Sequence, residues 1–284
     1  MYFCEQKTDI VVCEVGMGGR LDATNVTTPL VSVITTISQD HTEYLGQKLR
    51  DIAFEKGGII KKGKPAVTTA TQFIVISVLE AICQENASPL WRLNRDFRIH
   101  GRNRRDFNYI GSTLRLHHLE TGMAGHYQMT NAAAALAAIE ILSRTGFSVS
   151  EGHIRQGLRE AFLPGRLQVV RQNPTVVLDG AHNPGKARQL ARAIQEEFSS
   201  QSISLVFGIM RDKDVTGVLR HLAPLAKHIF LVRPRGTRAA EPEVLKTIVE
   251  RLGYSAVIAG NVTQGVRMAL DSAHPDDLIC VCGS

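Results

Sequence analysis

The sequence lacks an apolar run long enough to cross a membrane. Its longest apolar stretch, residues 132–142, is interrupted by Glu140, whereas a membrane-spanning helix needs about 20 apolar residues. The first residues also lack the basic stretch followed by an apolar core that marks a secretory signal peptide. We therefore expect a cytoplasmic protein without a membrane partner.

Cysteines are few, and their spacing offers no pairing pattern. There are five, an odd number, and none forms a Cys-x-x-Cys motif. Cys280 and Cys282 lie two residues apart on one face of an expected strand, which is a poor geometry for a local disulfide. We predict unpaired structural thiols in a reducing compartment, rather than a metal or redox site.

Charge is only slightly unbalanced, with 33 lysines and arginines against 27 acidic residues and a net charge of +6. This mild excess favours anionic ligands such as nucleotides but is weak evidence for nucleic acid. Six arginines crowd residues 92–105, yet Phe97 is the only aromatic residue among them. Nucleic-acid sites combine basic and aromatic side chains, so we expect a solvated face here, with attraction of polyanions as the alternative.

Short apolar runs alternate with helical patterns, which is typical of an α/β protein with mostly parallel sheets. In the first part we expect strands at residues 9–15, 30–37 and 64–69, helices at 49–61 and 73–83, a hairpin at 107–118, and helices at 131–142 and 154–161. Later strands at 175–178, 203–207, 229–232, 256–259 and 278–281 alternate with helices at 186–198, 215–222, 243–252 and 263–272. This second series predicts a complete doubly wound, Rossmann-like domain. Pro164 and Gly165 punctuate the chain, so we place the domains at 1–164 and 165–284.

A glycine-rich motif, Glu14-Val-Gly-Met-Gly-Gly-Arg-Leu-Asp-Ala-Thr-Asn25, follows the first expected strand. Open α/β sheets bind ligands at the carboxyl ends of their strands. The motif is not a dinucleotide fingerprint, because Leu21 stands where the third glycine would be. A tight turn would explain the glycines, but not the carboxylates and the arginine grouped around them. We therefore expect a ligand-binding loop.

Two further segments carry candidate metal chemistry. His41 follows the second expected strand, so it and Glu14 could converge on one cation, for which oxygen ligands near phosphate favour Mg²⁺. Lys56 ends the next helix, and the glycines at 57 and 58 suggest a close approach to another segment. Residues 58–64 match a P-loop pattern in part, but Pro65 replaces the serine or threonine and the order of helix and strand is reversed. We reject that match.

The segment Asp179-Gly-Ala-His-Asn-Pro184 lies between an expected strand and a helix. Asn183 or Asp179 could cap the helix, with Pro184 at its first position. The same helix start favours a phosphate or carboxylate ligand. Arg166, just past the domain boundary, is placed to reach across an interdomain cleft, where ligand sites are common.

Together these motifs resemble the folylpolyglutamate synthase/dihydrofolate synthase family of the Mur ligase superfamily. The segments that carry the resemblance are residues 14–26, 38–46, 54–67, 125–138, 163–170 and 176–184. The resemblance implies part of a Mur ligase central domain followed by a C-terminal Mur ligase domain. It also implies a ligase that uses ATP and Mg²⁺ to add L-glutamate to dihydropteroate or a reduced folate through an acyl phosphate, acting as a monomer.

The resemblance also assigns roles to residues of this sequence. Glu14 and His41 resemble the Mg²⁺ ligands. Lys56 resembles a lysine that becomes a carbamate and helps to hold a second Mg²⁺. The carbamate is needed because the positive charge of an unmodified lysine would repel the cation. The resemblance also assigns His41 and Lys56 a part in catalysis. The remaining assignments are a pterin-contact segment (Leu21, Asp22, Ala23), ATP contacts (Asn131, Arg166, Asp179), and a nucleotide and glutamate contact (His182).

The sequence departs from the family pattern before Glu14. Family members carry a P-loop and a serine Mg²⁺ ligand upstream of this motif, whereas only 13 residues precede Glu14 here. One hypothesis is therefore a folate ligase whose chain is shortened at its N-terminus, with little activity on its own. The alternative is a non-catalytic nucleotide-binding or interaction remnant of the family. A peptidoglycan-building Mur ligase is a third possibility, and it would need a nucleotide-sugar site.

Overall fold

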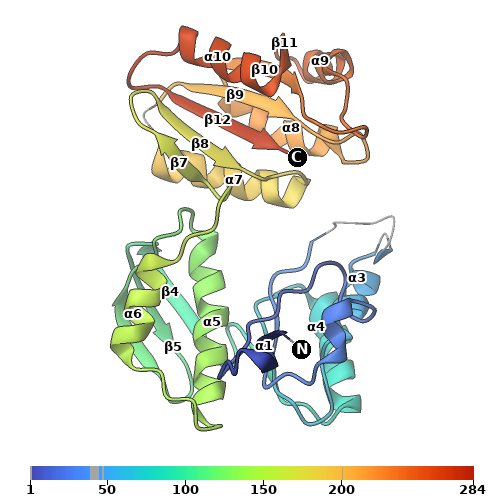
Figure 1. Ribbon diagram of the computed structural model, residues 1–284, viewed down its shortest axis with the longest axis vertical. Coiled ribbons are helices and arrows are strands. Elements are labelled where there is room, and N and C mark those ends of the chain that lie inside the picture. The colour runs from blue at the N-terminus through green and yellow to red at the C-terminus, as the bar shows by residue number, and fades with distance from the viewer. Residues whose placement is uncertain (1, 39–44, 47, 200) are drawn as a thin grey trace. The chain divides into compact units, whose positions relative to one another are not determined.

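The computed structural model describes residues 2–38, 45–46, 48–199 and 201–284, and it divides into two compact units. The first unit consists of residues 1–100, 109–116 and 133–150, and the second of residues 101–108, 117–132 and 151–284. Figure 1 shows the elements of both.

The first unit is built on a parallel three-stranded sheet in the order β1-β2-β3. These strands are β1 (Ser32–Ile34), β2 (Ala66–Thr68) and β3 (Leu90–Arg92), and helices α3 (Leu49–Gly57) and α4 (Phe73–Glu85) pack together beside them. Buried Ile52 and Leu79 join the helices to the core. The expected strands at 30–37 and 64–69 and helices at 49–61 and 73–83 are confirmed with shifted boundaries, whereas β3 was not expected.

The expected strand at residues 9–15 is wrong. Between helix α1 (Tyr2–Glu5) and the 3-10 turn η1 (Ala23–Val26), the chain runs without helix or strand. Val12 is 95% exposed, and its neighbours Ile10 and Val11 are also exposed. An apolar run forms a strand only when a neighbouring strand takes up its backbone hydrogen bonds, and no strand in the described part of the chain pairs with this run.

A small sheet in the order β4-β5-β6 lies next along the chain. It comprises β4 (Arg98–Asn103), β5 (Asp106–Ile110) and β6 (Arg115–Leu119), and is followed by helices α5 (Tyr127–Ser143) and α6 (Glu151–Glu160). The expected hairpin at 107–118 is confirmed as β5 and β6, whose turn is closed by a hydrogen bond from Gly111 N–H to the Leu114 carbonyl. Strand β4 was missed because its arginines and histidine are mostly exposed, so the segment lacks apolar alternation.

The second unit contains a six-stranded sheet in the order β11-β10-β9-β12-β8-β7. Its strands are β7 (Gln168–Arg171), β8 (Thr175–Asp179), β9 (Ile203–Gly208), β10 (His228–Arg233), β11 (Val257–Asn261) and β12 (Leu278–Gly283). All pairs are parallel except β7 with β8. The five strands predicted after residue 175 are therefore confirmed, and the edge strand β7 was missed.

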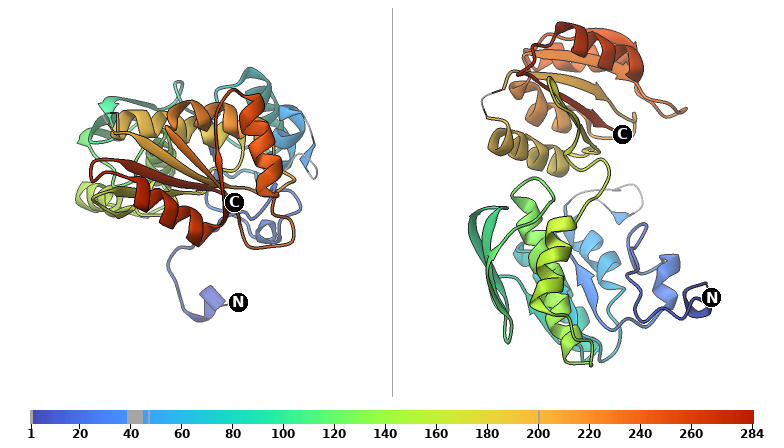
Figure 2. Two further views of the ribbon diagram at one scale, coloured as in Figure 1. Left: turned by 90° about the horizontal axis from the view of Figure 1, so that it is seen from above. Right: turned by 60° about the vertical axis from the view of Figure 1, so that its left-hand side comes forward.

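Helices cover both faces of this sheet, as Figures 1 and 2 show. Helices α7 (Pro184–Glu197), α8 (Val215–Leu222) and α9 (Pro242–Arg251) pack on one face, and α10 (Val262–Ser272) packs on the other. Successive side chains of strand β9 point to opposite faces of the sheet: Phe207 faces the side covered by α7, α8 and α9, and Val206 faces α10. The predicted α/β fold with a doubly wound second part is confirmed.

The described residues bear on two expectations from the sequence, unpaired cysteines and the lack of a membrane-spanning helix. All five cysteines are free; Cys83, Cys280 and Cys282 are buried, and the other two are exposed. Within the described ranges, no helix has both the length and the apolar character needed to cross a membrane.

Candidate functional site

The glycine-rich motif packs directly against the last turn of α3. Arg20 N–H donates to the carbonyl oxygen of Glu55 at 2.8 Å, and its guanidinium pairs with the Glu55 carboxylate at 3.0 Å. The same guanidinium lies 5.7 Å from the centre of the Phe54 ring. The fold thus joins two motifs that the sequence placed about 35 residues apart, and it brings the motif loop alongside Lys56.

The glycines of both motifs make this close approach possible. A Cβ atom on Gly19 would lie 2.7 Å from the Glu55 carbonyl oxygen and 3.1 Å from Lys56 Cα. A Cβ on Gly58 would overlap the side chain and backbone of Arg20, and one on Gly57 would meet the Cδ1 methyl of Ile82. The predicted close approach at residues 57 and 58 is confirmed, and Gly58 meets the glycine-rich motif itself.

This packing predicts unequal losses of stability for two Gly-to-Ala changes. Gly19→Ala should destabilise the protein by about 1–3 kcal/mol, because a rigid carbonyl blocks the new methyl group. Gly57→Ala should cost less than about 1 kcal/mol, because the Ile82 methyl can move and alanine favours the helix by roughly 1 kcal/mol. Urea unfolding of both variants tests this, and equal losses would contradict it.

Asp22 is held by its own loop. Its carboxylate accepts hydrogen bonds from the Thr24 hydroxyl at 2.6 Å, Thr24 N–H at 2.9 Å and Met17 N–H at 3.0 Å, and it caps η1. These bonds, led by the Thr24 hydroxyl, lower the pKa of Asp22 to about 2. The flanking Leu21 is 80% exposed and Ala23 is also exposed, so Asp22 shapes the loop while its neighbours face outward.

The lowered pKa predicts a pH-dependent effect of Asp22→Asn. Asparagine can still cap the turn, so the change mainly removes the charge. A carboxyl group with a lowered pKa in the folded state stabilises the protein above its unfolded pKa, and that contribution is lost as the pH falls toward the folded value. The parent should exceed the variant in urea midpoint at pH 6, and the gap should close as the pH falls from about 4 toward 2. A gap that does not change with pH would contradict this.

The predicted metal ligands are only partly described. Glu14 is exposed on the irregular segment before the glycines, and Lys56 lies in the last turn of α3 with intermediate exposure. His41 lies outside the described residues. Among the residues that are described, no three His, Cys, Asp or Glu side chains gather closely enough to hold a metal ion. The convergence of Glu14, His41 and Lys56 stays a prediction.

In the second unit, Asp179 stands at the carboxyl end of β8. One of its oxygens accepts a hydrogen bond from Leu167 N–H at 2.8 Å. Burial raises the pKa of Asp179, while that N–H and the Arg166 guanidinium act in the opposite direction. The Arg166 Nη1 atom sits 2.7 Å from where a Cβ of Gly180 would stand. The structure therefore brings together the predicted pair Arg166 and Asp179.

Tyr127, in the first turn of α5, belongs to the same cluster but was not predicted. Burial raises the pKa of Tyr127, and the nearby Asp179 carboxylate raises it further. Asn131, a predicted ATP contact, is one helical turn further along α5; it is exposed and donates to the Gln128 side chain at 2.8 Å. The spacing of four residues on one helix face was the signal that could have joined Tyr127 to Asn131.

His182 and Asn183 form the start of α7. His182 Nδ1 lies 2.9 Å from the Gly180 carbonyl oxygen, and its Nε2 lies 3.2 Å from the Lys186 ammonium. Because an ammonium only donates, Nε2 accepts and Nδ1–H donates. Asn183 caps the helix through Lys186 N–H at 2.8 Å, which confirms one of the two expected caps. Its buried Nδ2 has no hydrogen-bond partner in the described part of the chain.

This second-unit cluster can attract an anion. Arg166 and Lys186 supply positive charge, and the start of α7 adds the positive end of a helix dipole. Asp179 supplies a carboxylate that is already bonded to the backbone and near a cation. The cluster lies at the carboxyl edge of a parallel sheet, where α/β proteins bind ligands.

Comparisons with known proteins match nearly the whole chain to Mur ligase domains. A family model described as the Mur ligase middle domain matches residues 2–139, and one described as the Mur ligase, glutamate ligase domain matches residues 165–284. The folylpolyglutamate synthase of Lacticaseibacillus casei is 35% identical over 292 residues; the match covers 100% of this chain and 66% of that protein.

Two solved structures are also similar. The folylpolyglutamate synthase of Mycobacterium tuberculosis, complexed with ADP and AMPPCP, has a TM-score of 0.91 at 32% identity, covering 100% of this chain and 67% of that one. The bifunctional folylpolyglutamate synthase/dihydrofolate synthase of Yersinia pestis, complexed with AMPPNP and a Mn ion, has a TM-score of 0.88 at 33% identity, covering 100% and 65%. This chain thus spans no more than about two thirds of the length of the three relatives.

Proposed function

We propose, because the chain belongs to the folylpolyglutamate synthase/dihydrofolate synthase family of Mur ligases, that it acts in ATP-dependent addition of L-glutamate to dihydropteroate or to a reduced folate. The carrying observation is the second-unit cluster at the carboxyl end of β8 and the start of α7, where the positive charges of Arg166 and Lys186 and the helix N-terminus complement a polyphosphate. Support also comes from the ADP, AMPPCP and AMPPNP bound by the similar structures.

The proposed reaction has two steps, a phosphoryl transfer and an acyl transfer. The γ-phosphoryl group of ATP passes to a substrate carboxylate, which gives an acyl phosphate and ADP. The amine of glutamate then attacks the acyl carbon, an amide bond forms, and phosphate leaves with loss of a proton from nitrogen. Positioning and charge neutralisation dominate such phosphoryl transfers. Arg166 and Lys186 supply positive charge on the second unit, and we assign Asn131 and Asp179 to the nucleotide and His182 to the nucleotide and glutamate.

Mg²⁺ is the proposed cation, and the Glu14 carboxylate and the carbamate proposed on Lys56 would supply the oxygen donors that it prefers. Glu14 offers an exposed carboxylate on the loop that packs beside Lys56. We assign Glu14 and His41 as its ligands, a carbamate on Lys56 as a ligand of a second Mg²⁺, and Leu21 to Ala23 as pterin contacts. When bound, the cation neutralises phosphate charge. The Mn ion in the Yersinia pestis structure supports a divalent metal in the family.

We further propose that the protein is a cytoplasmic monomer without nucleic-acid or membrane partners, with domains at 1–164 and 165–284. The alternative, a non-catalytic nucleotide-binding member of the family, also fits the second-unit cluster. Binding of nucleotide alone therefore does not separate the two functions, and turnover does.

The deciding experiment measures ADP release and glutamate incorporation with dihydropteroate or tetrahydrofolate. It is run on this chain and on a chimaera that adds the N-terminal part of the Lacticaseibacillus casei relative. Glutamate-dependent turnover in either form supports the ligase, and nucleotide binding without turnover in both supports the alternative.

In the active form, Arg166→Ala should raise the ATP requirement much more than the folate requirement, because its charge lies beside Asp179. Gly180→Ala is the matched variant: its methyl group would displace the Arg166 guanidinium without removing it, so a smaller change of the same kind is expected. Equal effects on ATP and folate would assign Arg166 a structural role.

A further inference from the structure

An ion pair within the second unit ties the end of α7 to segments that lie far before it in the chain. The Arg104 guanidinium, in the turn between β4 and β5, donates to both oxygens of Glu197, the last residue of α7, at 2.6 and 3.1 Å. The side chains of Arg104 and Glu197 are only 16% and 19% exposed. A two-point, charge-assisted contact fixes orientation as well as distance, so this pair determines how the turn lies against the helix.

Arg104 also holds the segment that precedes α5. Its remaining guanidinium nitrogen, Nη1, donates to the carbonyl oxygen of buried Thr121 at 3.1 Å, and Thr121 N–H donates to the Arg104 carbonyl oxygen at 2.9 Å. Burial acts to raise the pKa of Glu197, but the hydrogen bonds and charge of Arg104, together with the Gly125 N–H, lower it. One arginine and one carboxylate thus connect the β4–β5 turn, residues 121–125 and α7.

Residues 125–127 extend this attachment to the Asp179 cluster. A Cβ atom on Gly125 would lie 3.1 Å from the Ala193 Cβ, in the turn of α7 before its last, and 2.6 Å from the Tyr127 Cε1. Tyr127 packs against the core of the second unit. Burial and the neighbouring Asp179 carboxylate both raise the pKa of Tyr127. The segment therefore follows α7 from its last turn and ends at the second-unit cluster.

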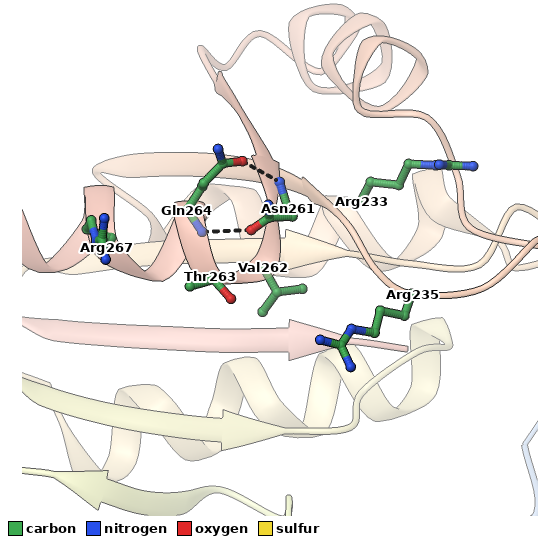
Figure 3. A pocket seen from close by; sticks show the side chains of 7 residues that line it. All are labelled: Arg233, Arg235, Asn261, Val262, Thr263, Gln264 and Arg267. Carbon is green, nitrogen blue, oxygen red and sulfur yellow. Dashed lines mark hydrogen bonds between the residues drawn. The ribbon is translucent and has the colours of Figure 1, made fainter.

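Two other polar contacts of this unit differ from the ion pair in their reach. Figure 3 shows the start of α10, where Asn261 and Gln264 accept from each other's backbone N–H at 3.0 and 3.1 Å. On α7 itself, Arg192 pairs with Glu196 at 2.7 Å, four residues away. Both contacts join residues of one helical turn, whereas the ion pair joins residues 93 positions apart in the chain. A contact of that reach positions one segment relative to another.

We infer that Arg104 and Glu197 are positioning residues, which hold Tyr127 at the second-unit cluster through residues 121–125. Without the pair, the segment keeps its covalent links but loses its attachment to α7, so Tyr127 would leave its place beside Asp179. The effect on ligand binding rests on the proposed function. Where the cluster binds a nucleotide, the pair sets the affinity for that nucleotide without touching it.

Nitration of Tyr127 by tetranitromethane measures the positioning without any ligand. The reagent modifies accessible tyrosines, and mass spectrometry of the peptide that contains Tyr127 gives its rate. Glu197→Ala should raise that rate at least about threefold, because the segment is released from α7. Glu196→Ala is the matched control: it removes the adjacent carboxylate and an exposed ion pair from the same helix. Alanine favours the helix in both variants, so the control should stay within about twofold of the parent.

Binding of ADP, measured by isothermal titration calorimetry, tests the consequence for the cluster. Glu197→Ala should weaken ADP binding at least about fivefold, and Glu196→Ala less than about twofold. In a Tyr127→Ala background, Glu197→Ala should have almost no further effect, because groups that act through one another are not additive. Thermal melts establish that the variants fold. Glu197→Gln, which keeps one oxygen for Arg104, replaces the alanine variant if that variant does not fold.

The two measurements separate this inference from the proposed function. Parent-like nitration of Glu197→Ala, or an equal rise in Glu196→Ala, overturns the inference. Parent-like ADP binding by Glu197→Ala, or additive losses in the Tyr127→Ala background, overturns the role of the pair in nucleotide affinity. If the parent binds no ADP, the nucleotide site of the proposed function is lost, and the nitration rates still decide whether the pair positions Tyr127.

Discussion

Lys56→Ala is expected to lower the ligation rate by at least about 10²–10³-fold, the cost of losing one preorganised charge-stabilising group. The proposed carbamate would turn a repelling ammonium into two oxygen donors beside Mg²⁺. The position of Lys56 supports this role, because Gly19 and Arg20 of the glycine-rich loop pack onto its turn of α3. The measurement is the steady-state rate in whichever form of the protein turns over.

Two further substitutions separate a carbamate from a simple positive charge. Lys56→Arg keeps the charge but cannot form the carbamate, so it should be as inactive as Lys56→Ala. Lys56→Glu supplies a permanent carboxylate and should retain part of the activity. Removal of bicarbonate should slow the parent but not Lys56→Glu. Lys62→Ala, an exposed lysine after the same helix, is the control. An active Lys56→Arg variant would refute the carbamate assignment.

Glu140→Ala is expected to destabilise the first unit by about 3–5 kcal/mol, because buried donors would lose their acceptor. Glu140 is only 2% exposed on α5. One of its oxygens accepts from the Tyr109 hydroxyl at 3.0 Å, and the other from the Thr113 hydroxyl at 2.9 Å, from Thr113 N–H, and from Leu114 N–H at 3.3 Å. The carboxylate thus fastens the turn between β5 and β6 to the helix.

Two milder variants show whether the hydrogen bonds cause the loss. Glu140→Gln keeps one oxygen for the turn and can donate its amide to the Tyr109 oxygen, so it should cost clearly less than Glu140→Ala. Tyr109→Phe removes one bond and should cost about 1 kcal/mol. Urea unfolding monitored by circular dichroism gives all three values. A loss below about 1 kcal/mol for Glu140→Ala would show that water replaces these contacts.

The sequence contained much of the candidate site, because its chemistry lies in short local motifs. The expectation that Asn183 or Asp179 caps α7 was correct for Asn183, and capping depends only on neighbouring residues. The glycines at 57 and 58 correctly indicated a close approach. The sequence did not reveal the partners in these contacts. Arg20 and Gly58 are distant in the chain, as are Tyr127 and Asp179, and each pair meets only in the folded structure.

The sequence by itself determined the strand and helix alternation of the second unit, the unpaired cysteines and the family motifs, because each is written in local spacing. Only the tertiary structure decided which apolar runs become strands. Residues 9–15 have the composition of a buried strand and form none, whereas the polar segment at 98–103 does. A strand exists only where another backbone accepts and donates its hydrogen bonds, and that partner is chosen by the fold as a whole.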